Sequence, residues 1–281
     1  MERFDQKIKH KISSIEYDME PGEELMESMF NKLDDITVET PVIDLNEKLS
    51  SSGLVFRIAA SILVALVAGF VAFQLNEVDQ YIAKGAKEEH LLPDGSKVYV
   101  NADSRIAYNK LSWIISRSVS LEGEAFFEVE AGSTFTVSTP LGQTQVLGTS
   151  FNVYSRDADY RVECLSGKVR VTYTGVQLET ILTPGKGTSF NKIEGVNEFE
   201  IDIDQRADWR QGEFYFDNES LKYVISTFSR QYGVEVRMSE SLYEITYSGY
   251  FDDKNLDVAL KLICDPLDLK YKIMGPYVVI E

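Results

Sequence analysis

Few residues of this 281-residue chain could do chemistry, and their positions limit what that chemistry could be. The chain has two histidines, His10 and His90, which lie on opposite sides of a long apolar segment. A zinc site or a Ser-His-Asp triad needs its histidine and the partner residues close together. The phosphate-binding loop, the dinucleotide fingerprint and the Gly-x-Ser-x-Gly elbow are absent from the sequence. We therefore expect no conventional enzyme activity, no metal site and no bound cofactor.

The two cysteines are the other reactive groups, Cys164 in VECLSG and Cys264 in LKLICDPL. Both lie in apolar patterns, where a free cysteine usually packs as a small buried hydrophobe. A disulfide between them is the alternative, because both follow the apolar segment and would share one compartment. We predict two buried thiols and no disulfide.

The element that divides the chain is residues 53–75, GLVFRIAASILVALVAGFVAFQL. At 1.5 Å per residue this run can cross a bilayer core of about 30 Å. Arg57 is its one charge, close enough to an end for the guanidinium to reach the headgroups. A buried core helix and a secretory signal are the alternatives, but the run is too long and uncharged for the first. It also lacks the small-residue cleavage site of the second. We predict a single uncleaved transmembrane helix.

The charges around this segment favour a cytoplasmic N-terminus. Lys48 and Arg57 lie at its N-terminal end, whereas Lys84 and Lys87 follow only at some distance, and positive charge is enriched on the cytoplasmic side. The whole chain carries 45 acidic and 28 basic residues, a formal net charge of −17 at pH 7. Because phosphate contacts need a basic face, we expect no direct binding to nucleic acid.

Residues 1–52 have too little apolar material for a core of their own, and they predict two short amphipathic helices. The apolar stripe of the first helix consists of Phe4, Ile8, Ile12 and Ile15. The second helix, over residues 23–33, has Leu25 and Met29 on its apolar face. Such stripes are typical of helices that bind in the groove of a partner protein. A self-packed hairpin, or a tail with no partner, is the alternative.

Residues 89–190 have the pattern of an all-β domain. Turns are predicted at Pro93-Asp94-Gly95 and at Glu122-Gly123, where proline and glycine have the required backbone angles. Alternation of apolar and polar residues predicts strands over 145–147, 151–154, 160–165 and 168–172.

Five phrases in this region, in order, resemble the FecR family of single-pass anti-sigma regulators: LPDGSKVYVNADSRIAY, VSLEGEAFFEVE, QVLGTSFNVYS, LSGKVRV and LTPGKGTSF. The resemblance implies a cytoplasmic sigma-binding segment over residues 1–52 and a transmembrane helix over 53–75. A periplasmic β domain would follow over 76–195. The tryptophan-bearing helical pattern usual in the family's cytoplasmic segment is absent from residues 1–52.

Residues 196–281 contain an internal repeat, which aligns Phe216 with Phe251 and Leu221 with Leu256. Each copy has the pattern strand, helix, strand. The predicted ranges are 213–216, 220–232 and 234–237, then 248–251, 256–264 and 269–273, with a last strand over 277–280 that would complete a small sheet. Asn218 and Lys254-Asn255 lie where the helices need N-terminal caps.

These two βαβ-like repeats resemble the short signalling domain of secretins and of TonB-dependent outer-membrane transporters. A sheet with a free edge could pair with a strand of a partner protein, which gives a physical route for receiving a signal. A closed domain with a purely structural role is the alternative.

The resemblance also draws attention to Gly148-Thr149, because some FecR-like regulators cut themselves at a Gly-Thr bond in a motif similar to VLGTSF. The Thr149 hydroxyl would attack the preceding carbonyl in an N-to-O acyl shift. A tight turn between two strands is the alternative.

The expected fold is multidomain, with a short α-helical cytoplasmic segment, one transmembrane helix, an all-β domain and a small α+β domain. The expected function is that of an inner-membrane anti-sigma regulator, with its N-terminus in the cytoplasm and its C-terminus in the periplasm. It would relay a signal from a TonB-dependent outer-membrane transporter to an extracytoplasmic-function sigma factor. The alternative is a membrane-anchored envelope scaffold with no role in transcription.

Overall fold

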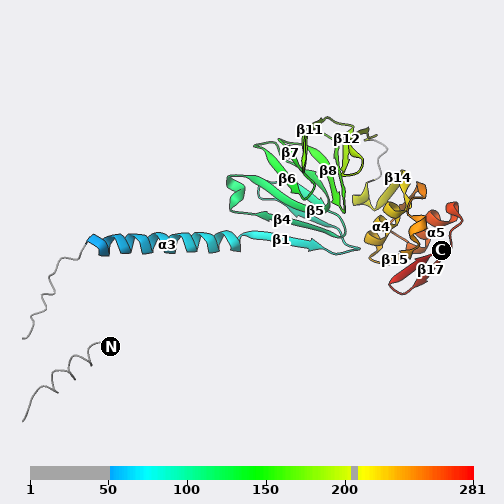
Figure 1. Ribbon diagram of the computed structural model, residues 1–281, viewed down its shortest axis with the longest axis horizontal. Helices are drawn as coiled ribbons and strands as arrows, with labels where there is room; N and C mark the ends of the chain where they lie inside the picture. The colour runs from blue at the N-terminus through cyan, green and yellow to red at the C-terminus, as the bar shows by residue number, and fades with distance from the viewer. Residues whose placement is uncertain (1–50, 204–207) are drawn as a thin grey trace, which may run out of the picture. The chain divides into compact units, whose positions relative to one another are not determined.

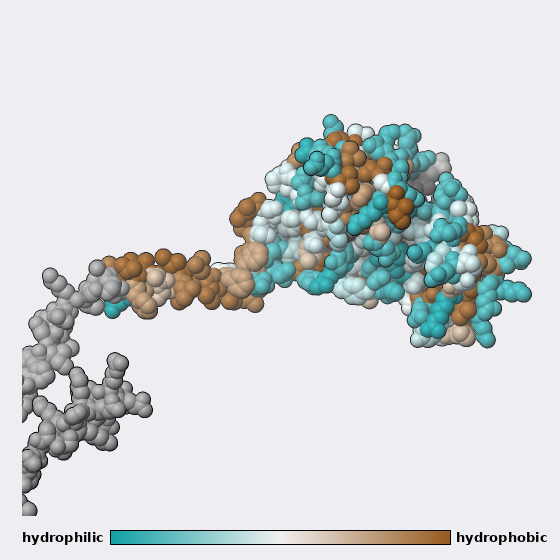
Figure 2. Space-filling model, viewed as in Figure 1, coloured by the Kyte–Doolittle hydropathy of each residue, from teal (hydrophilic) through white to brown (hydrophobic). Residues whose placement is uncertain are grey.

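The computed structural model describes residues 51–203 and 208–281. The first described element is the helix α3 (Ser51–Leu75), which begins two residues before the predicted range (Figure 1). Its stretch Leu54–Leu75 is long and apolar enough to cross a membrane, and none of it is buried by the rest of the protein. Figure 2 shows this stretch as a continuous apolar surface. The predicted helix is confirmed, and it fits a single-pass membrane protein.

A large β domain follows the helix directly, and the all-β prediction is confirmed. Its thirteen described strands form one branched sheet. They are β1 (Glu77–Ile82), β2 (Glu88–Leu91), β3 (Lys97–Val100), β4 (Ser104–Asn109), β5 (Arg117–Glu128), β6 (Phe135–Thr139), β7 (Gly142–Val146), β8 (Ser150–Arg156), β9 (Asp159–Cys164), β10 (Val169–Tyr173), β11 (Val176–Leu182), β12 (Lys186–Asn191) and β13 (Gly195–Glu200). The short 3-10 helix η1 (Ser112–Ile114) joins β4 to β5.

The long strand β5 belongs to both halves of this sheet. Its first half pairs with β4 and, in parallel, with β6, whereas its second half pairs with β3 and β8. The two halves enclose one hydrophobic core, in which the Phe127 ring stacks on Phe151 at 5.1 Å and meets the edge of Phe135 at 5.9 Å. The alternating apolar residues of the strands therefore point to a shared interior.

The turn predicted at Glu122-Gly123 is wrong, because both residues lie inside β5. Gly123 has a φ of 114°, and a side chain there would lie 2.5 Å from the Ser104 hydroxyl. The glycine therefore lets β5 bend from one half of the sheet to the other while Ser104 approaches closely. The turn at Pro93-Asp94-Gly95 is confirmed, since the Gly95 amide donates to the Leu92 carbonyl at 3.0 Å.

The β domain is longer at both ends than the strand pattern indicated. Strand β1 begins directly after α3 and pairs with β4, although its polar sequence EVDQYI has no clear alternation. Strand β13 pairs with β12 and continues to Glu200, beyond the predicted β pattern of residues 89–190. Both are edge strands, which bury little and therefore have weak sequence patterns.

The C-terminal region is α+β and contains the strand–helix–strand order twice. The first copy is β14 (Glu213–Ser220), α4 (Leu221–Tyr232) and β15 (Glu235–Met238). The second copy is β16 (Thr246–Asp252), α5 (Leu256–Cys264) and β17 (Tyr271–Met274), followed by β18 (Tyr277–Ile280). The strands form two small sheets instead of the one expected: β14 pairs with β16, and β18 lies between β15 and β17.

One of the two predicted helix caps is correct. The Asn255 side chain accepts a hydrogen bond from the Val258 amide at 3.1 Å and caps α5. Asn218 does not cap α4, because Ser220 has that role through the Tyr223 amide at 3.3 Å. Asn218 instead has a φ of 53° at a bulge of β14, a left-handed conformation that asparagine tolerates better than most residues.

Candidate functional site

Gly148 and Thr149 lie in the connection between β7 and β8, and Thr149 directly precedes the first residue of β8. Thr149 is only 4% exposed, and its carbonyl accepts a hydrogen bond from the Val129 amide at 2.9 Å. Its hydroxyl oxygen is buried, and no described residue forms a hydrogen bond with it. A buried hydroxyl without a partner is uncommon, because it loses its hydrogen bonds to water and gains none in return.

The peptide bond between these residues is closely packed on two sides. A side chain on Gly148 would lie 2.8 Å from the Ala131 Cα atom. On the other side, a side chain on Gly167 would lie 2.9 Å from the Gly148 carbonyl oxygen and 2.4 Å from a methyl carbon of Thr149. Gly167 also has a φ of 73°. Both glycines are therefore needed for this packing, and the peptide has little room to move.

The described residues include both candidates for self-cleavage and none of the candidates for sigma binding. The candidates for sigma binding lie outside the described residues: Phe4, Ile8, Ile12, Ile15, Leu25 and Met29.

Cys164 and Cys264 are free and buried, which confirms their predicted burial. Burial raises the pKa of both thiols to about 11, so they stay protonated and are poor nucleophiles at neutral pH.

A chain of buried and half-buried polar side chains joins the β domain to the C-terminal region. The Glu124 carboxylate on β5 accepts from the side-chain amides of Asn101 at 2.8 Å and Asn152 at 3.0 Å. Gln231 on α4 donates to the Asn101 side chain at 2.9 Å, and the Trp209 indole donates to the Asn152 side chain at 3.2 Å. Such a network favours one arrangement of the two domains, because a shift would leave the buried amide groups of Asn101 and Asn152 without partners.

Two charged pairs also join the β domain to the C-terminal region. Arg161 on β9 binds Glu219 on β14 at 2.7 Å, and its guanidinium carbon lies 4.7 Å from the centre of the Tyr223 ring. Burial raises the pKa of the Tyr223 hydroxyl, which therefore remains neutral. Lys87, between β1 and β2, binds Asp253 at 2.6 Å. Such ion pairs contribute little to the free energy of folding, but they help to fix the orientation of the two domains.

Apolar contacts complete the interface. Trp209 is 6% exposed and lies in the hydrophobic core of the C-terminal region, and Phe126 of β5 lies in the same core. The Arg210 guanidinium carbon lies 3.8 Å from the centre of the Phe126 ring. The sequence reasoning missed these residues. The available signal was Trp209, one of two tryptophans in the chain, in the otherwise polar stretch IDIDQRADWRQGE.

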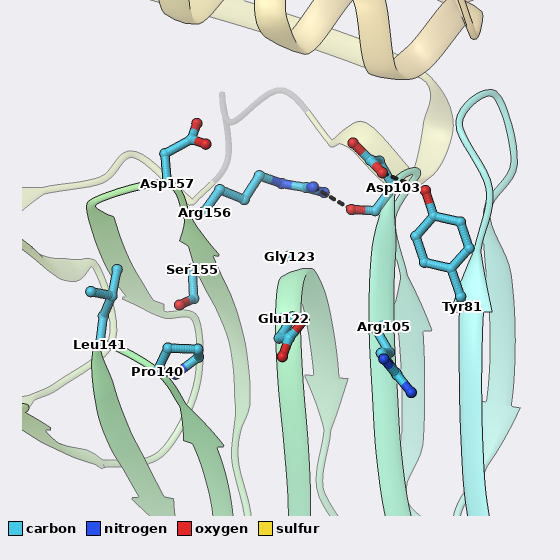
Figure 3. Close-up of a pocket in the computed structure, with 10 residues that line it drawn as sticks. All are labelled: Tyr81, Asp103, Arg105, Glu122, Gly123, Pro140, Leu141, Ser155, Arg156 and Asp157. Carbon is cyan, nitrogen blue, oxygen red and sulfur yellow. Dashed lines mark hydrogen bonds between the residues drawn. The ribbon is translucent and has the colours of Figure 1, made fainter.

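A cavity of about 480 Å³ lies where β1 and β8 end and β4 begins (Figure 3). Arg156 reaches across it and donates to the carbonyl oxygens of Ala102 and Asp103 and to the Ser104 hydroxyl. Arg105 is paired with the carboxylate of Asp79. Because both guanidinium groups have acceptors within the protein, we assign no ligand to this cavity.

Comparisons with known proteins agree with this architecture. Two family profiles match the chain, "FecR protein" over residues 79–170 and "FecR, C-terminal" over residues 213–280. Two crystal structures of one protein from Parabacteroides distasonis ATCC 8503, described as a candidate anti-sigma factor, are similar in fold. Each has a TM-score of 0.68 and 27% sequence identity, and the match covers 73% of this chain and 98% of that one. A search of curated proteins found no match.

Proposed function

Because this chain belongs to the FecR family of anti-sigma factors, we propose that it relays an envelope signal to a sigma factor across the inner membrane. Residues 1–52 would bind an extracytoplasmic-function sigma factor in the cytoplasm, and α3 would cross the membrane. The β domain and the C-terminal region would lie in the periplasm, where the signalling domain of a TonB-dependent transporter binds.

The observation that carries this proposal is that the β domain is hydrogen-bonded both to the C-terminal region and to the end of α3. The Gln231–Asn101 and Trp209–Asn152 hydrogen bonds join the C-terminal region to the β domain. The Asn109 side chain donates to the Phe73 carbonyl in the last turn of α3 at 2.7 Å. Packed elements with fixed contacts can transmit a displacement, so a partner bound outside has a route to the membrane helix.

The inner contact can be tested with Ile8→Asp/Ile12→Asp. Two carboxylates on the predicted apolar stripe would become buried without partners, which costs several kcal/mol and lowers affinity more than about 100-fold. We expect the full-length variant to lose the sigma factor that co-purifies with the unmodified chain.

The matched control for this variant is Gln6→Asp/Ser13→Asp, which adds the same charge on the opposite face of the predicted helix and should keep the complex. Equal binding by both double variants would exclude the stripe as the interface. If the unmodified chain itself retains no sigma factor, the scaffold function would replace the one proposed here.

For the outer contact we propose the open edge of β17. The amides of Lys270 and Glu281 each donate to the other's carbonyl at 2.8 Å, so this is a hydrogen-bonded pair. In an antiparallel pair such residues alternate with residues whose N–H and C=O point outward. Lys272 therefore bonds to Val279 on β18, whereas the backbone groups of Tyr271 and Ile273 point to the open edge.

Ile273→Pro should weaken binding of the transporter's signalling domain by about ten-fold or more, because proline removes an outward N–H from the partner's ladder. The pairing of β17 with β18 does not use that N–H, so the variant should stay folded. Binding of the purified full chain to the isolated signalling domain can be measured by calorimetry. Ile273→Thr keeps the N–H and should bind normally, and unchanged binding by the proline variant would exclude this edge.

We also propose that the chain cuts itself between Gly148 and Thr149. The Thr149 hydroxyl oxygen would attack the Gly148 carbonyl carbon, the carbon–nitrogen bond would break, and the nitrogen would take up the hydroxyl proton. Water would then hydrolyse the resulting ester, leaving a carboxylate on Gly148 and a free amine on Thr149. The unpartnered hydroxyl and the close packing of Gly148 between Ala131 and Gly167 support this chemistry.

A further inference from the structure

Residues 110–116, between β4 and β5, expose an unusual amount of apolar surface. Ile114 is 88% exposed and Ile115 is 92% exposed, and Leu111 is exposed as well. Three large aliphatic side chains in one short segment are more than the scattered exposed hydrophobes of a typical protein surface.

This segment is held in one conformation, although its apolar side chains point outward. The Asn109 side-chain oxygen accepts from the Leu111 amide at 2.9 Å and the Ser112 amide at 3.2 Å. The amide of Ile115 donates to the Ser112 carbonyl at 2.9 Å. Trp113 is buried against Tyr108 and Phe135, with ring centres 5.6 and 5.9 Å away. The exposure of the isoleucines is therefore a fixed feature of the fold.

The same segment is hydrogen-bonded to the end of α3. Besides the Asn109–Phe73 bond, the Lys110 amide donates to the Asn76 carbonyl at 2.9 Å. The apolar stretch Leu54–Leu75 has 22 residues, and at 1.5 Å per residue it measures about 33 Å, the thickness of the bilayer core. A helix of that length ends at the headgroup region, and residues bonded to its last turn lie at the same depth. Figure 2 shows apolar atoms gathered beside this end of the helix.

We propose that residues 110–116 form a membrane-contact loop, in which Leu111, Ile114 and Ile115 insert into the lipid surface where α3 ends. This proposal rests on the proposed membrane span of α3. Aliphatic side chains gain free energy when they leave water for the acyl-chain boundary, and a preformed loop loses little entropy in doing so. The β domain would then hold the membrane at two points, and rotation about the axis of α3 would be restricted.

Lipid is the occupant that the position favours. A partner protein would have to bind the loop at the membrane surface, where the last turn of α3 already lies beside it. The lipid surface is continuous with the apolar surface of α3 and needs no additional component. Among the described residues of the β domain, Ile193 is also strongly exposed, at 96%, in the turn between β12 and β13. That turn follows Phe190, which pairs with Tyr160 on β9, and none of the described hydrogen bonds at the end of α3 involves β9, β12 or β13. It should therefore stay in water.

The test uses the full chain in lipid vesicles, with a single cysteine that carries an environment-sensitive fluorophore. Cys164 and Cys264 are fully buried and should not react in the folded protein. Labels at Ile114→Cys and Ile115→Cys should be quenched at least about two-fold by lipids with a quencher near the headgroup, as expected for interfacial side chains. The label at Ile193→Cys should not be quenched.

A fourth variant, Leu66→Cys, separates this proposal from the topology on which it rests. Leu66 lies near the middle of the stretch Leu54–Leu75, so its label is measured with lipids that carry the quencher deep in the acyl chains. If the Leu66 label is quenched by lipid and the Ile114 and Ile115 labels behave like Ile193, the membrane-contact loop is excluded while the span stands. If the Leu66 label is not quenched, the span itself is excluded. Labels at Ile114 and Ile115 that leave water without quenching by lipid would indicate contact with protein, which also overturns the proposal.

Discussion

Replacing Thr149 with valine should leave the chain whole under conditions in which the unmodified chain separates into two pieces. The acyl shift needs a hydroxyl on the residue after the scissile carbonyl, and valine has none. Cleavage of the 281-residue chain would give an N-terminal piece that ends at Gly148 and a C-terminal piece that starts at Thr149. The pieces should stay together, because β5 and β8 pair across the break. Mass spectrometry of the purified protein would identify the new termini.

The structure indicates that Thr149→Val removes the hydroxyl and changes little else. Valine keeps the β-branched shape, and no described hydrogen bond is lost because the Thr149 hydroxyl has no partner. The free energy of unfolding should therefore change by less than about 1 kcal/mol. Thr149→Ser retains the hydroxyl and should still be cut. An intact unmodified chain under all conditions, or a fragment that persists in the valine variant, would leave Gly148-Thr149 as a structural turn.

Trp209→Ala should lower the free energy of unfolding of the outer region by about 3–5 kcal/mol, the usual cost of removing a large buried aromatic side chain. Trp209 is buried in the core of the C-terminal region, and its loss also leaves the Asn152 side-chain oxygen without a donor. Urea denaturation of the full chain in detergent would measure the change. Because the residue joins two domains, hydrogen exchange should rise first at the interface strands β5, β8 and β14.

The matched control is Tyr215→Ala, which removes an aromatic side chain that is 67% exposed on the neighbouring strand β14. It should change the free energy of unfolding by less than about 0.5 kcal/mol. Trp209→Phe should lie between the two alanine variants, since it keeps most of the packing and loses the indole donor. Equal stability of Trp209→Ala and Tyr215→Ala would contradict the role of Trp209 at the domain interface, and with it the proposed path of transmission.

Local pattern in the sequence was sufficient for the elements that are set by their own residues. The uncharged apolar run predicts α3, because length and hydropathy are properties of that segment alone. The internal repeat predicts two strand–helix–strand units, and Asn255 predicts the start of α5, because capping involves residues three apart. Strands β9 and β10 have alternating patterns because they bury one face, and the predicted ranges 160–165 and 168–172 overlap them.

The tertiary structure decided the features that depend on residues distant in sequence. The glycine at position 123 predicts a turn when the sequence is considered alone. In the structure it lies within β5, because it pairs with β8 and Ser104 packs closely against it. The Thr149 hydroxyl has no hydrogen-bond partner because the residues packed around it offer none. Ile114 lies beside the end of α3 because β1, which follows α3, pairs with β4. These features follow from long-range register, which fixes which side chains meet, and no local periodicity contains that information.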